Sequence, residues 1–315
     1  MSPFFNIHKF FTLISVMMVL PFTGCIDTGG GLNPFDNSLE RPKWGLGNQW
    51  SYAIVTPEVD VVTTMVVANI NEVDYEMGAA DLRDAQLHAT LNYNPALGRV
   101  SRSNLEIYEN GEPQKLFSFP LEEDKSWTFT LLGVSDFIAR VDRITDNEAR
   151  IVAGAPTGEQ IVYTYSSDIS WLTSLSYTNT EGLDLLSMTL IDYADDFNGE
   201  VHFLRAGDLY SEIWEDTSVD IFDTFISGHH SSGEEWDKII FYLETRTADD
   251  ASGDFILKDP VGNEAIFRPL TPNTDAVEWG SLDARTGEWQ IQLALEGDSR
   301  VRLVVAGALS YSWNV

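Results

Sequence analysis

The sequence contains a single cysteine, Cys25, and few basic side chains for a chain of 315 residues. A lone cysteine excludes an intramolecular disulfide, so the folded part must be held together by its core alone. Lys and Arg number 19 against 49 Asp and Glu, and the formal net charge is −30. A surface of this sign repels nucleic acid and anionic lipid headgroups, which argues against both as ligands. Such diffuse acidity suits a salty exterior, where self-repulsion is screened, and it equally serves simple solubility.

The N-terminal region lacks an apolar run long enough to cross a bilayer. Residues 10–22 (FFTLISVMMVLPF) carry no charge, but the run is well short of the ~20 residues that a membrane-spanning helix needs. Lys9 precedes it, and the small residues Thr23 and Gly24 follow it, directly before Cys25. Peptidases that remove signal sequences require small side chains before the bond they cut, so the pattern predicts a signal peptide over residues 1–24.

Residues 20–25 (LPFTGC) resemble the lipobox of prokaryotic surface lipoproteins, bacterial or archaeal, although Phe22 stands where that family prefers Leu. The resemblance implies that Cys25 becomes the mature N-terminus and is acylated. We therefore expect an extracytoplasmic protein with the membrane as a partner, attached to the cell membrane or cell surface by its lipid anchor. A signal anchor that is never cut and a secretory signal with an incidental cysteine are the alternatives. Residues 25–41, with three consecutive glycines and a proline, then form the anchor and a flexible tether.

A convincing helical pattern of ten or more residues is also missing, and residues 81–89 and 219–226 are the best short candidates. Alternation with a period of two residues predicts strands instead. In the first half, the predicted strands are residues 48–55, 61–68, 126–132 and 160–165. We therefore predict an all-β protein whose residues 42–193 form an N-terminal antiparallel β domain.

Three segments of this domain carry a family resemblance: residues 44–52 (WGLGNQWSY), residues 119–121 (FPL) before Trp127, and residues 161–177 (IVYTYSSDISWLTSLSY). Their order resembles that of uncharacterised prokaryotic lipoprotein β-domains, some of which resemble the half-barrels of lipoprotein-sorting carriers. The resemblance implies a curved, half-barrel-like antiparallel sheet, and it adds a lipid or acyl carrier to the functional alternatives.

The second half begins after residues 194–200, a carboxylate-rich stretch that we interpret as an acidic linker. Strands are predicted at residues 236–245, 253–258, 288–295 and 300–305. The pattern, including the strand that enters through Gly287-Glu288-Trp289, resembles jelly-roll β-sandwiches of secreted proteins. The resemblance implies a jelly-roll-like β-sandwich over residues 201–315.

Two patterns suggest metal binding. His229 and His230 lie near Glu234 and Glu235 in a Gly/Ser loop, and imidazoles with a carboxylate could bind a transition metal. Adjacent histidines on a loop point in different directions, however, so a solvated loop is the competing interpretation. Calcium is the one cofactor that the oxygen-rich loops suggest, because Ca²⁺ takes six to eight oxygen ligands in a flexible geometry. The candidate calcium ligands are Asp192, Asp195, Asp196, Asn198 and Glu200 in one loop, and Asp249, Asp250 and Asp254 in another.

No catalytic motif accompanies these patterns, since Ser231-Ser232 lacks the G-x-S-x-G setting of an activated serine. Trp171, Trp214 and Trp236 flank polar loops and could stack on sugars, but we favour the interpretation that they belong to the core. We expect a non-enzymatic surface lipoprotein that binds an envelope protein, a polysaccharide or another extracellular ligand. The alternatives are a secreted hydrolase that uses a carboxylate pair and the lipid or acyl carrier.

Overall fold

The computed structural model describes residues 38–109 and 111–315. The predicted signal peptide, Cys25 and most of the predicted tether lie outside the described residues. Within these residues the chain forms eighteen β-strands and one α-helix, which confirms the prediction of an all-β fold. The described residues contain no helix with the length and hydrophobicity that crossing a bilayer requires.

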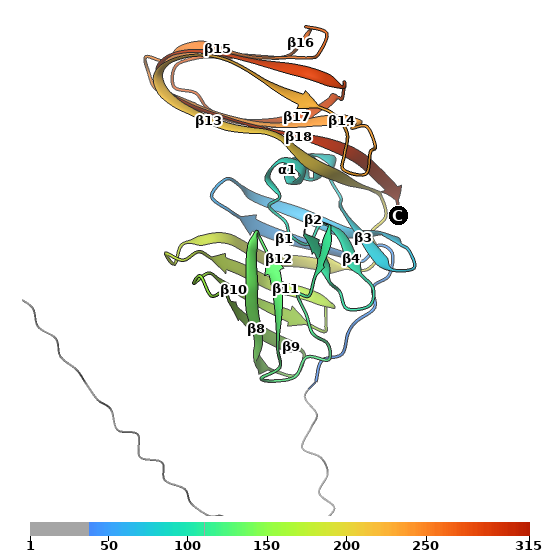
Figure 1. The fold of residues 1–315 in the computed structure, drawn as a ribbon. Coiled ribbons are helices and arrows are strands. Elements are labelled where there is room, and N and C mark those ends of the chain that lie inside the picture. Colours follow the sequence, from blue (N-terminus) through green and yellow to red (C-terminus); the bar gives the residue numbers. More distant parts are fainter. Residues whose placement is uncertain (1–37, 110) are drawn as a thin grey trace, which may run out of the picture. The chain divides into compact units, whose positions relative to one another are not determined.

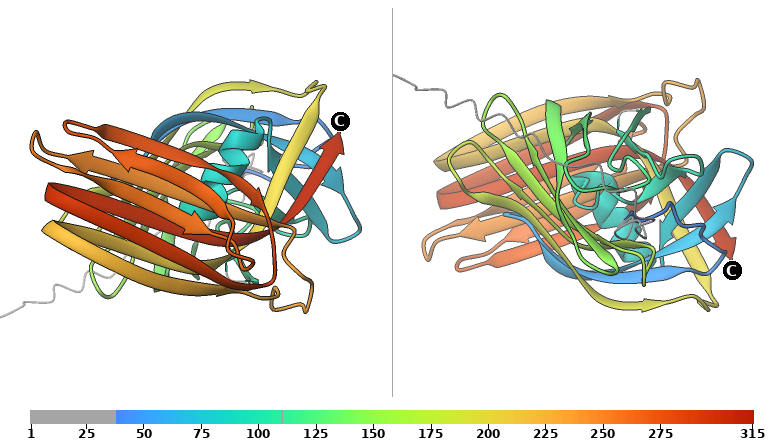
Figure 2. Two further views of the ribbon diagram at one scale, coloured as in Figure 1. Left: turned by 90° about the horizontal axis from the view of Figure 1, so that it is seen from above. Right: turned by 90° about the horizontal axis from the view of Figure 1, so that it is seen from below.

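The first half of the described chain forms a curved antiparallel sheet, as predicted (Figures 1 and 2). Each strand pairs with the next along the chain, except that β6 and β7 are not paired and β1 pairs with both β2 and β12. The strands are β1 (Gln49–Val55), β2 (Asp60–Ile70), β3 (Asp74–Ala79), β4 (Gly98–Ser101), β5 (Ile107–Glu109), β6 (Glu112–Gln114), β7 (Ser126–Leu131), β8 (Val134–Ile144), β9 (Glu148–Gly154), β10 (Gln160–Ser166), β11 (Trp171–Thr178) and β12 (Asp184–Ala194).

One face of the curved sheet encloses an aromatic core. The alternation in β1 directs Trp50 inward, where its indole Nε1 donates to the carbonyl of Ile169 at 2.9 Å. The rings of Trp44 and Trp171 lie 4.8 Å apart between centroids, and the ring of Phe117 lies 5.4 Å from that of Trp171. Burying such rings stabilises a fold that has no disulfide, because each removes a large apolar area from water. The protein's own side chains therefore fill the inner side of this sheet.

The second half is a jelly roll of six strands, two of which are long and bent, as predicted. β13 (Glu200–Ser227) and β18 (Gly287–Asn314) are each 28 residues long and pair along their whole length. β14 (Lys238–Thr247) pairs with the C-terminal half of β18 and with β17 (Asp275–Asp283). β15 (Ser252–Lys258) pairs with the N-terminal half of β18 and with β16 (Glu264–Leu270).

The two layers of the sandwich are therefore β13-β18-β14-β17 and β13-β18-β15-β16, which is the strand order of a jelly roll. In Figure 1 the long strands β13 and β18 bend from one layer into the other. Between the layers lies a second hydrophobic core, which includes Phe255, Trp289 and Leu303.

The helix α1 (Leu82–Leu91) coincides with the first of the two short helix candidates. Asp81 caps its N-terminus by accepting a hydrogen bond from the backbone N–H of Arg83 at 2.8 Å. The second candidate, residues 219–226, is not helical, because these residues belong to β13 and pair with residues 288–295 of β18. An isolated helix of eight residues is marginal, whereas the strand gains a partner along its whole length.

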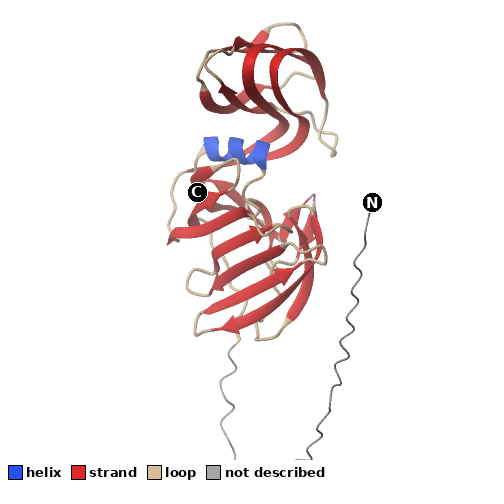
Figure 3. Ribbon diagram, turned by 90° about the vertical axis from the view of Figure 1, so that its left-hand side faces the viewer, coloured by secondary structure: helices blue, strands red, loops and turns tan. Residues whose placement is uncertain are grey.

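The predicted acidic linker, residues 194–200, lies between the end of β12 and the start of β13, while residues 37–315 as a whole form one compact unit. Helix α1 contacts β3 of the curved sheet and β13, β14, β17 and β18 of the jelly roll (Figure 3). β3 also meets β13 directly, where Ala79 pairs with His202. A Cβ on Gly78 would lie 2.5 Å from Cγ1 of Val201, so glycine is needed for this close approach.

Candidate functional site

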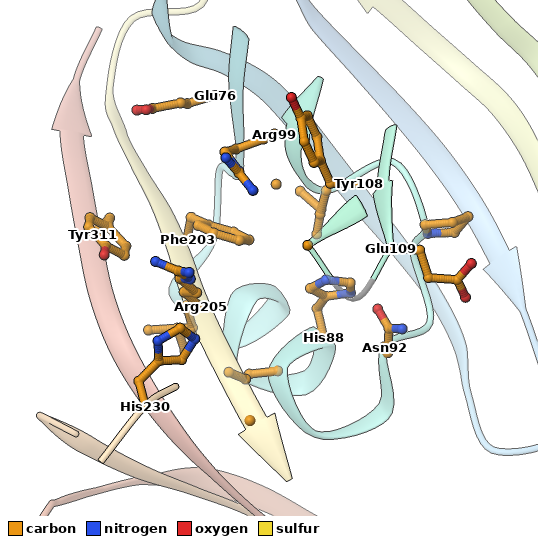
Figure 4. A pocket seen from close by; sticks show the side chains of 18 of the residues that line it. Glu76, His88, Asn92, Arg99, Tyr108, Glu109, Phe203, Arg205, His230 and Tyr311 are labelled. Carbon is orange, nitrogen blue, oxygen red and sulfur yellow. The ribbon is translucent and has the colours of Figure 1, made fainter. Parts of the chain in front are cut away.

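A cleft of about 890 Å³ lies where β4, β5 and the end of α1 face the first part of β13 and the last part of β18. The loop of residues 228–236, which follows β13, forms its rim (Figure 4). Its volume is within the range of ordinary ligand pockets, roughly 300–1,000 Å³. The cleft therefore has the size and the mixed lining of a ligand site.

One wall of the cleft carries a strip of three aromatic rings, Phe203, Tyr311 and Trp313. Phe203 of β13 pairs in register with Tyr311 of β18, and their rings are 6.4 Å apart at an interplanar angle of 26°. The rings of Tyr311 and Trp313 are 6.1 Å apart and nearly parallel, at 13°. Tyr311 is the most open of the three, with 37% of its surface exposed. We call these three residues the aromatic strip.

Tyr311 is exposed because the β13–β18 ribbon extends beyond the sandwich. Phe203 lies against Gly98, and Trp313 packs against the cluster of Val66, Ala68 and Val201. Leu303 and Val305 of β18 point into the sandwich core, and side chains two residues apart on a strand share a face. Tyr311 and Trp313 therefore continue the core-facing side of β18. β14 pairs with β18 only as far as Ala308, so the sandwich ends before it covers these rings.

Trp236 closes the end of the sandwich next to the strip. Its ring lies against Gly207 and Gly307, which pair across β13 and β18; a Cβ on Gly307 would lie 2.6 Å from the indole. The ring of His230 meets this indole edge-on, with centroids 5.3 Å apart. His230 is held further by Ser232, whose backbone N–H donates to Nδ1 at 3.0 Å. The rim of the cleft is thus anchored through Trp236.

The opposite wall presents Arg99 in a fixed position. Its guanidinium lies 4.2 Å from the centre of the Tyr108 ring, a cation–π distance, and 3.9 Å from the carboxylate of Asp74. Tyr108 in turn donates its hydroxyl to Asp74 at 3.0 Å. The adjacent Gly98, at a φ of 106°, leaves room for Phe203, whose ring carbon Cζ would lie 3.3 Å from a Cβ there.

The helix supplies His88 to the cleft at its C-terminal end. Burial lowers the pKa of His88 to about 4, so the imidazole is neutral at physiological pH. Its Nδ1 accepts from the backbone N–H of Asn94 at 3.4 Å, which leaves the proton on Nε2. Burial, with the nearby charge of Arg205, also lowers the pKa of His230. Both imidazoles are therefore uncharged polar groups.

The charges in the cleft are nearly balanced. Two guanidinium groups, those of Arg99 and Arg205, stand against the carboxylates of Glu76, Glu109 and Asp208. Arg205 makes no ion pair with any described side chain, and it lies beside His230 (Figure 4). The cleft thus offers both donors and acceptors of hydrogen bonds without a large charge of either sign.

The predicted metal ligands do not converge in the structure. His229 pairs with Glu235 through a β-bridge in the rim, while His230 faces Trp236. The calcium candidates lie at the β12–β13 junction and around the start of β15. Among residues 38–109 and 111–315, no three His, Cys, Asp or Glu side chains come together as a group that could hold a metal ion.

The three tryptophans considered as sugar-stacking candidates belong to the cores, which agrees with the interpretation favoured from the sequence. Trp171 is fully buried in the first core, Trp236 is 9% exposed, and Trp214 packs against the jelly-roll core. The aromatic strip itself was not predicted. Its signal in the sequence is the alternation of residues 309–313 (LSYSW), which places two aromatic rings on one face of the last strand.

Comparisons with known proteins do not assign this chain to a family. No family model matches the chain, and no curated protein matches it. Among solved structures, the chain is similar to an exo-β-1,3-galactanase from Phanerochaete chrysosporium, with 8% identity, a TM-score of 0.21 and 78% of each chain covered. It is also similar to the infectious bursal disease virus structure (Gx strain), with 13% identity, a TM-score of 0.17, and 93% of this chain and 79% of that chain covered. Likeness at this level carries no argument about function.

Proposed function

We propose that this chain is a non-enzymatic surface lipoprotein, anchored through Cys25, that binds an extracellular or envelope ligand in the cleft. The observation that supports binding most directly is the exposed ring of Tyr311 in the aromatic strip on the cleft wall. Aromatic rings left open to solvent forgo the free energy of burial, roughly 25 cal/mol per Å² of apolar area. A ligand that covers Tyr311 would recover part of that free energy.

The lipid-carrier alternative places an acyl chain inside the curved sheet. That space is occupied by the protein's own rings, including the fully buried Trp50, Tyr163 and Trp171. The cleft outside it is lined by Arg99, Arg205 and carboxylates, which would lose their hydration without gaining partners against an acyl chain. These contacts favour a ligand with polar groups.

The test compares capture of envelope material by the full chain and by two variants. Tyr311→Ala removes the most exposed ring of the strip, and Phe222→Ala is the matched control, because Phe222 is a 65% exposed aromatic of β13 that does not line the cleft. The protein is expected to retain a component from the envelope of the cells that make it, and Tyr311→Ala is expected to retain at least tenfold less. Equal capture by both variants, or no capture at all, would refute binding in the cleft.

The anchor is tested separately by mass spectrometry of the mature protein. The full chain is expected to carry acyl mass on Cys25, and Cys25→Ser is expected to lack it. Acyl mass that persists in Cys25→Ser would show that attachment does not depend on this cysteine.

A further inference from the structure

We propose that the ligand of the cleft is an uncharged oligosaccharide, with a sugar ring on Tyr311 and its hydroxyl groups on the polar side chains around it. This inference rests on the proposed binding function and names the ligand class for the same site.

The aromatic strip provides the apolar half of such a site. A pyranose ring has two flat faces of C–H groups, and these pack on an aromatic ring as another apolar surface does. The rings of Phe203, Tyr311 and Trp313 follow each other at 6.4 and 6.1 Å along the ribbon with small interplanar angles. Phe203 and Trp313 therefore flank Tyr311, the exposed ring of the three, which is the one open to a sugar.

The polar half of the site consists of side chains with planar hydrogen-bonding groups. Arg205, Asn92 and Asp208 are exposed, and all three line the cleft near the strip or the end of α1. Arg205 can only donate, Asp208 can only accept, and Asn92 does both. A hydroxyl group also donates and accepts, so a ligand rich in hydroxyls can satisfy this mixed set, whereas a purely apolar ligand leaves it without partners.

Charge favours an uncharged saccharide over an acidic one. The two guanidinium groups are outnumbered by the carboxylates of Glu76, Glu109 and Asp208, and Arg99 is already shared with Asp74. The imidazoles of His88 and His230 add no positive charge at neutral pH, because burial lowers the pKa of each. The net charge of −30 on the whole chain repels polyanions as they approach.

The experiment identifies the chemical class of the captured ligand. Envelope extract is divided into portions treated with periodate, which cleaves the vicinal diols of sugars, with protease, or with neither, and each is offered to the immobilised full chain. Neutral hexasaccharides of glucose, mannose and galactose, and a galacturonic acid hexasaccharide, serve as defined probes. We expect capture to survive protease and to be lost after periodate, and at least one neutral hexasaccharide to bind more tightly than the acidic one.

Variants connect the result to the strip and to Arg205. Tyr311→Phe keeps the ring and is expected to bind within threefold of the unmodified protein, whereas Tyr311→Ala is expected to bind at least tenfold more weakly. Arg205→Gln is expected to weaken binding at least threefold. Arg143→Gln is its control. Arg143 is an exposed arginine of β8, so this substitution removes the same charge at a position away from the cleft.

Each result bears on the inference. Capture that survives periodate but not protease would show a protein ligand and overturn the saccharide class, while the proposed binding function would stand. Tighter binding of the galacturonic acid hexasaccharide would overturn the preference for an uncharged sugar. If Tyr311→Ala binds as well as Tyr311→Phe, or nothing binds, both the inference and the proposed binding in the cleft fall.

Discussion

At the scale of single residues, the cleft depends on positions that have no side chain. Gly207 and Gly307 pair across β13 and β18 and give the Trp236 ring a flat surface to rest on. Trp236 then supports His230 at the rim. The two glycines have no side chain that could contact a ligand, yet they determine the position of Trp236 and therefore of the rim of the cleft.

Substitution at Gly307 is expected to disturb this arrangement. In Gly307→Ala the new methyl group would lie 2.6 Å from the indole of Trp236, so the ring must move. We expect a loss of about 1–3 kcal/mol in the free energy of unfolding, measured by urea denaturation. The control is Gly154→Ala in β9, where a Cβ meets nothing within 4 Å; its effect is expected to stay within about 0.5 kcal/mol. Equal effects at the two positions would contradict the packing described for Trp236.

The imidazole of His88 makes stability depend on pH. Its pKa in the folded protein is about 4, below the ordinary value of 6.5, so the unfolded chain binds more protons between these two values. Stability is therefore fully present above about pH 6.5 and falls as the pH drops towards 4. Because burial of His88 causes this pKa shift, replacing His88 with a residue that does not titrate removes its contribution to the loss of stability at low pH.

The variant His88→Gln tests this dependence. From pH 7 to pH 4.5, the unmodified protein is expected to lose about 1–3 kcal/mol more in the free energy of unfolding than His88→Gln does. His229→Gln, at an exposed position in the rim, is expected to show the same pH dependence as the unmodified protein. If His88→Gln loses as much stability as the unmodified protein, the assignment of a buried neutral imidazole is wrong.

At the scale of elements, the alternation of apolar and polar residues predicted many of the strands, but it did not show that neighbouring predicted strands join into one long strand. The predicted strands at residues 288–295 and 300–305 are both parts of β18. The register of β13 and β18 shifts between Asp208 and Tyr210 and between Asp216 and Ser218. The second shift lies where the part of β18 that pairs with β14 gives way to the part that pairs with β15. Such shifts depend on the partner strand, so alternation in one segment does not reveal them. The exposure of Tyr311 near the end of β18 is a consequence of this continuity.

Helix α1 was only a short candidate in the sequence, yet it contacts β3 of the curved sheet and four strands of the jelly roll. Its small side chains Ala85 and Ala89 lie in one cluster with Leu204 and Ala308 of the jelly roll. On the same helix, Arg83 accepts from Nε1 of Trp279 at 3.1 Å through its carbonyl. A ten-residue helix is marginal alone, so this packing is what stabilises it.

Loss of the helix cap is expected to weaken α1 measurably. In Asp81→Ala the backbone N–H of Arg83 loses its side-chain acceptor, and we expect a loss of about 1 kcal/mol in the free energy of unfolding. The control Asp254→Ala removes the same charge from an exposed strand position in β15 and is expected to change stability by less than about 0.5 kcal/mol. Urea denaturation of both variants measures the difference, and no difference would show that the cap contributes nothing.

At the scale of the whole molecule, side chains of the curved sheet pack directly against side chains of the jelly roll. Arg302 of β18 lies 3.5 Å from the carboxylate of Glu58, and Tyr242 and Val304 of the jelly roll belong to the hydrophobic cluster of the curved sheet. Separation of the two halves would expose these side chains and both faces of α1. The sequence predicted the two sheets from their separate patterns, but it could not show contacts between residues so far apart along the chain.

This shared packing predicts a single unfolding transition. Differential scanning calorimetry of the full chain is expected to give one peak whose van't Hoff and calorimetric enthalpies agree, because neither half keeps its complete core alone. Two separated peaks would show instead that the curved sheet and the jelly roll unfold independently.

Binding in the cleft is tested most directly by how much the loss of the Tyr311 ring weakens it. The dissociation constant for the captured envelope ligand is measured by titration for the full chain, for Tyr311→Ala and for Phe222→Ala. We predict that Tyr311→Ala raises the constant at least tenfold and that Phe222→Ala leaves it unchanged. Equal constants for all three proteins would contradict binding in the cleft.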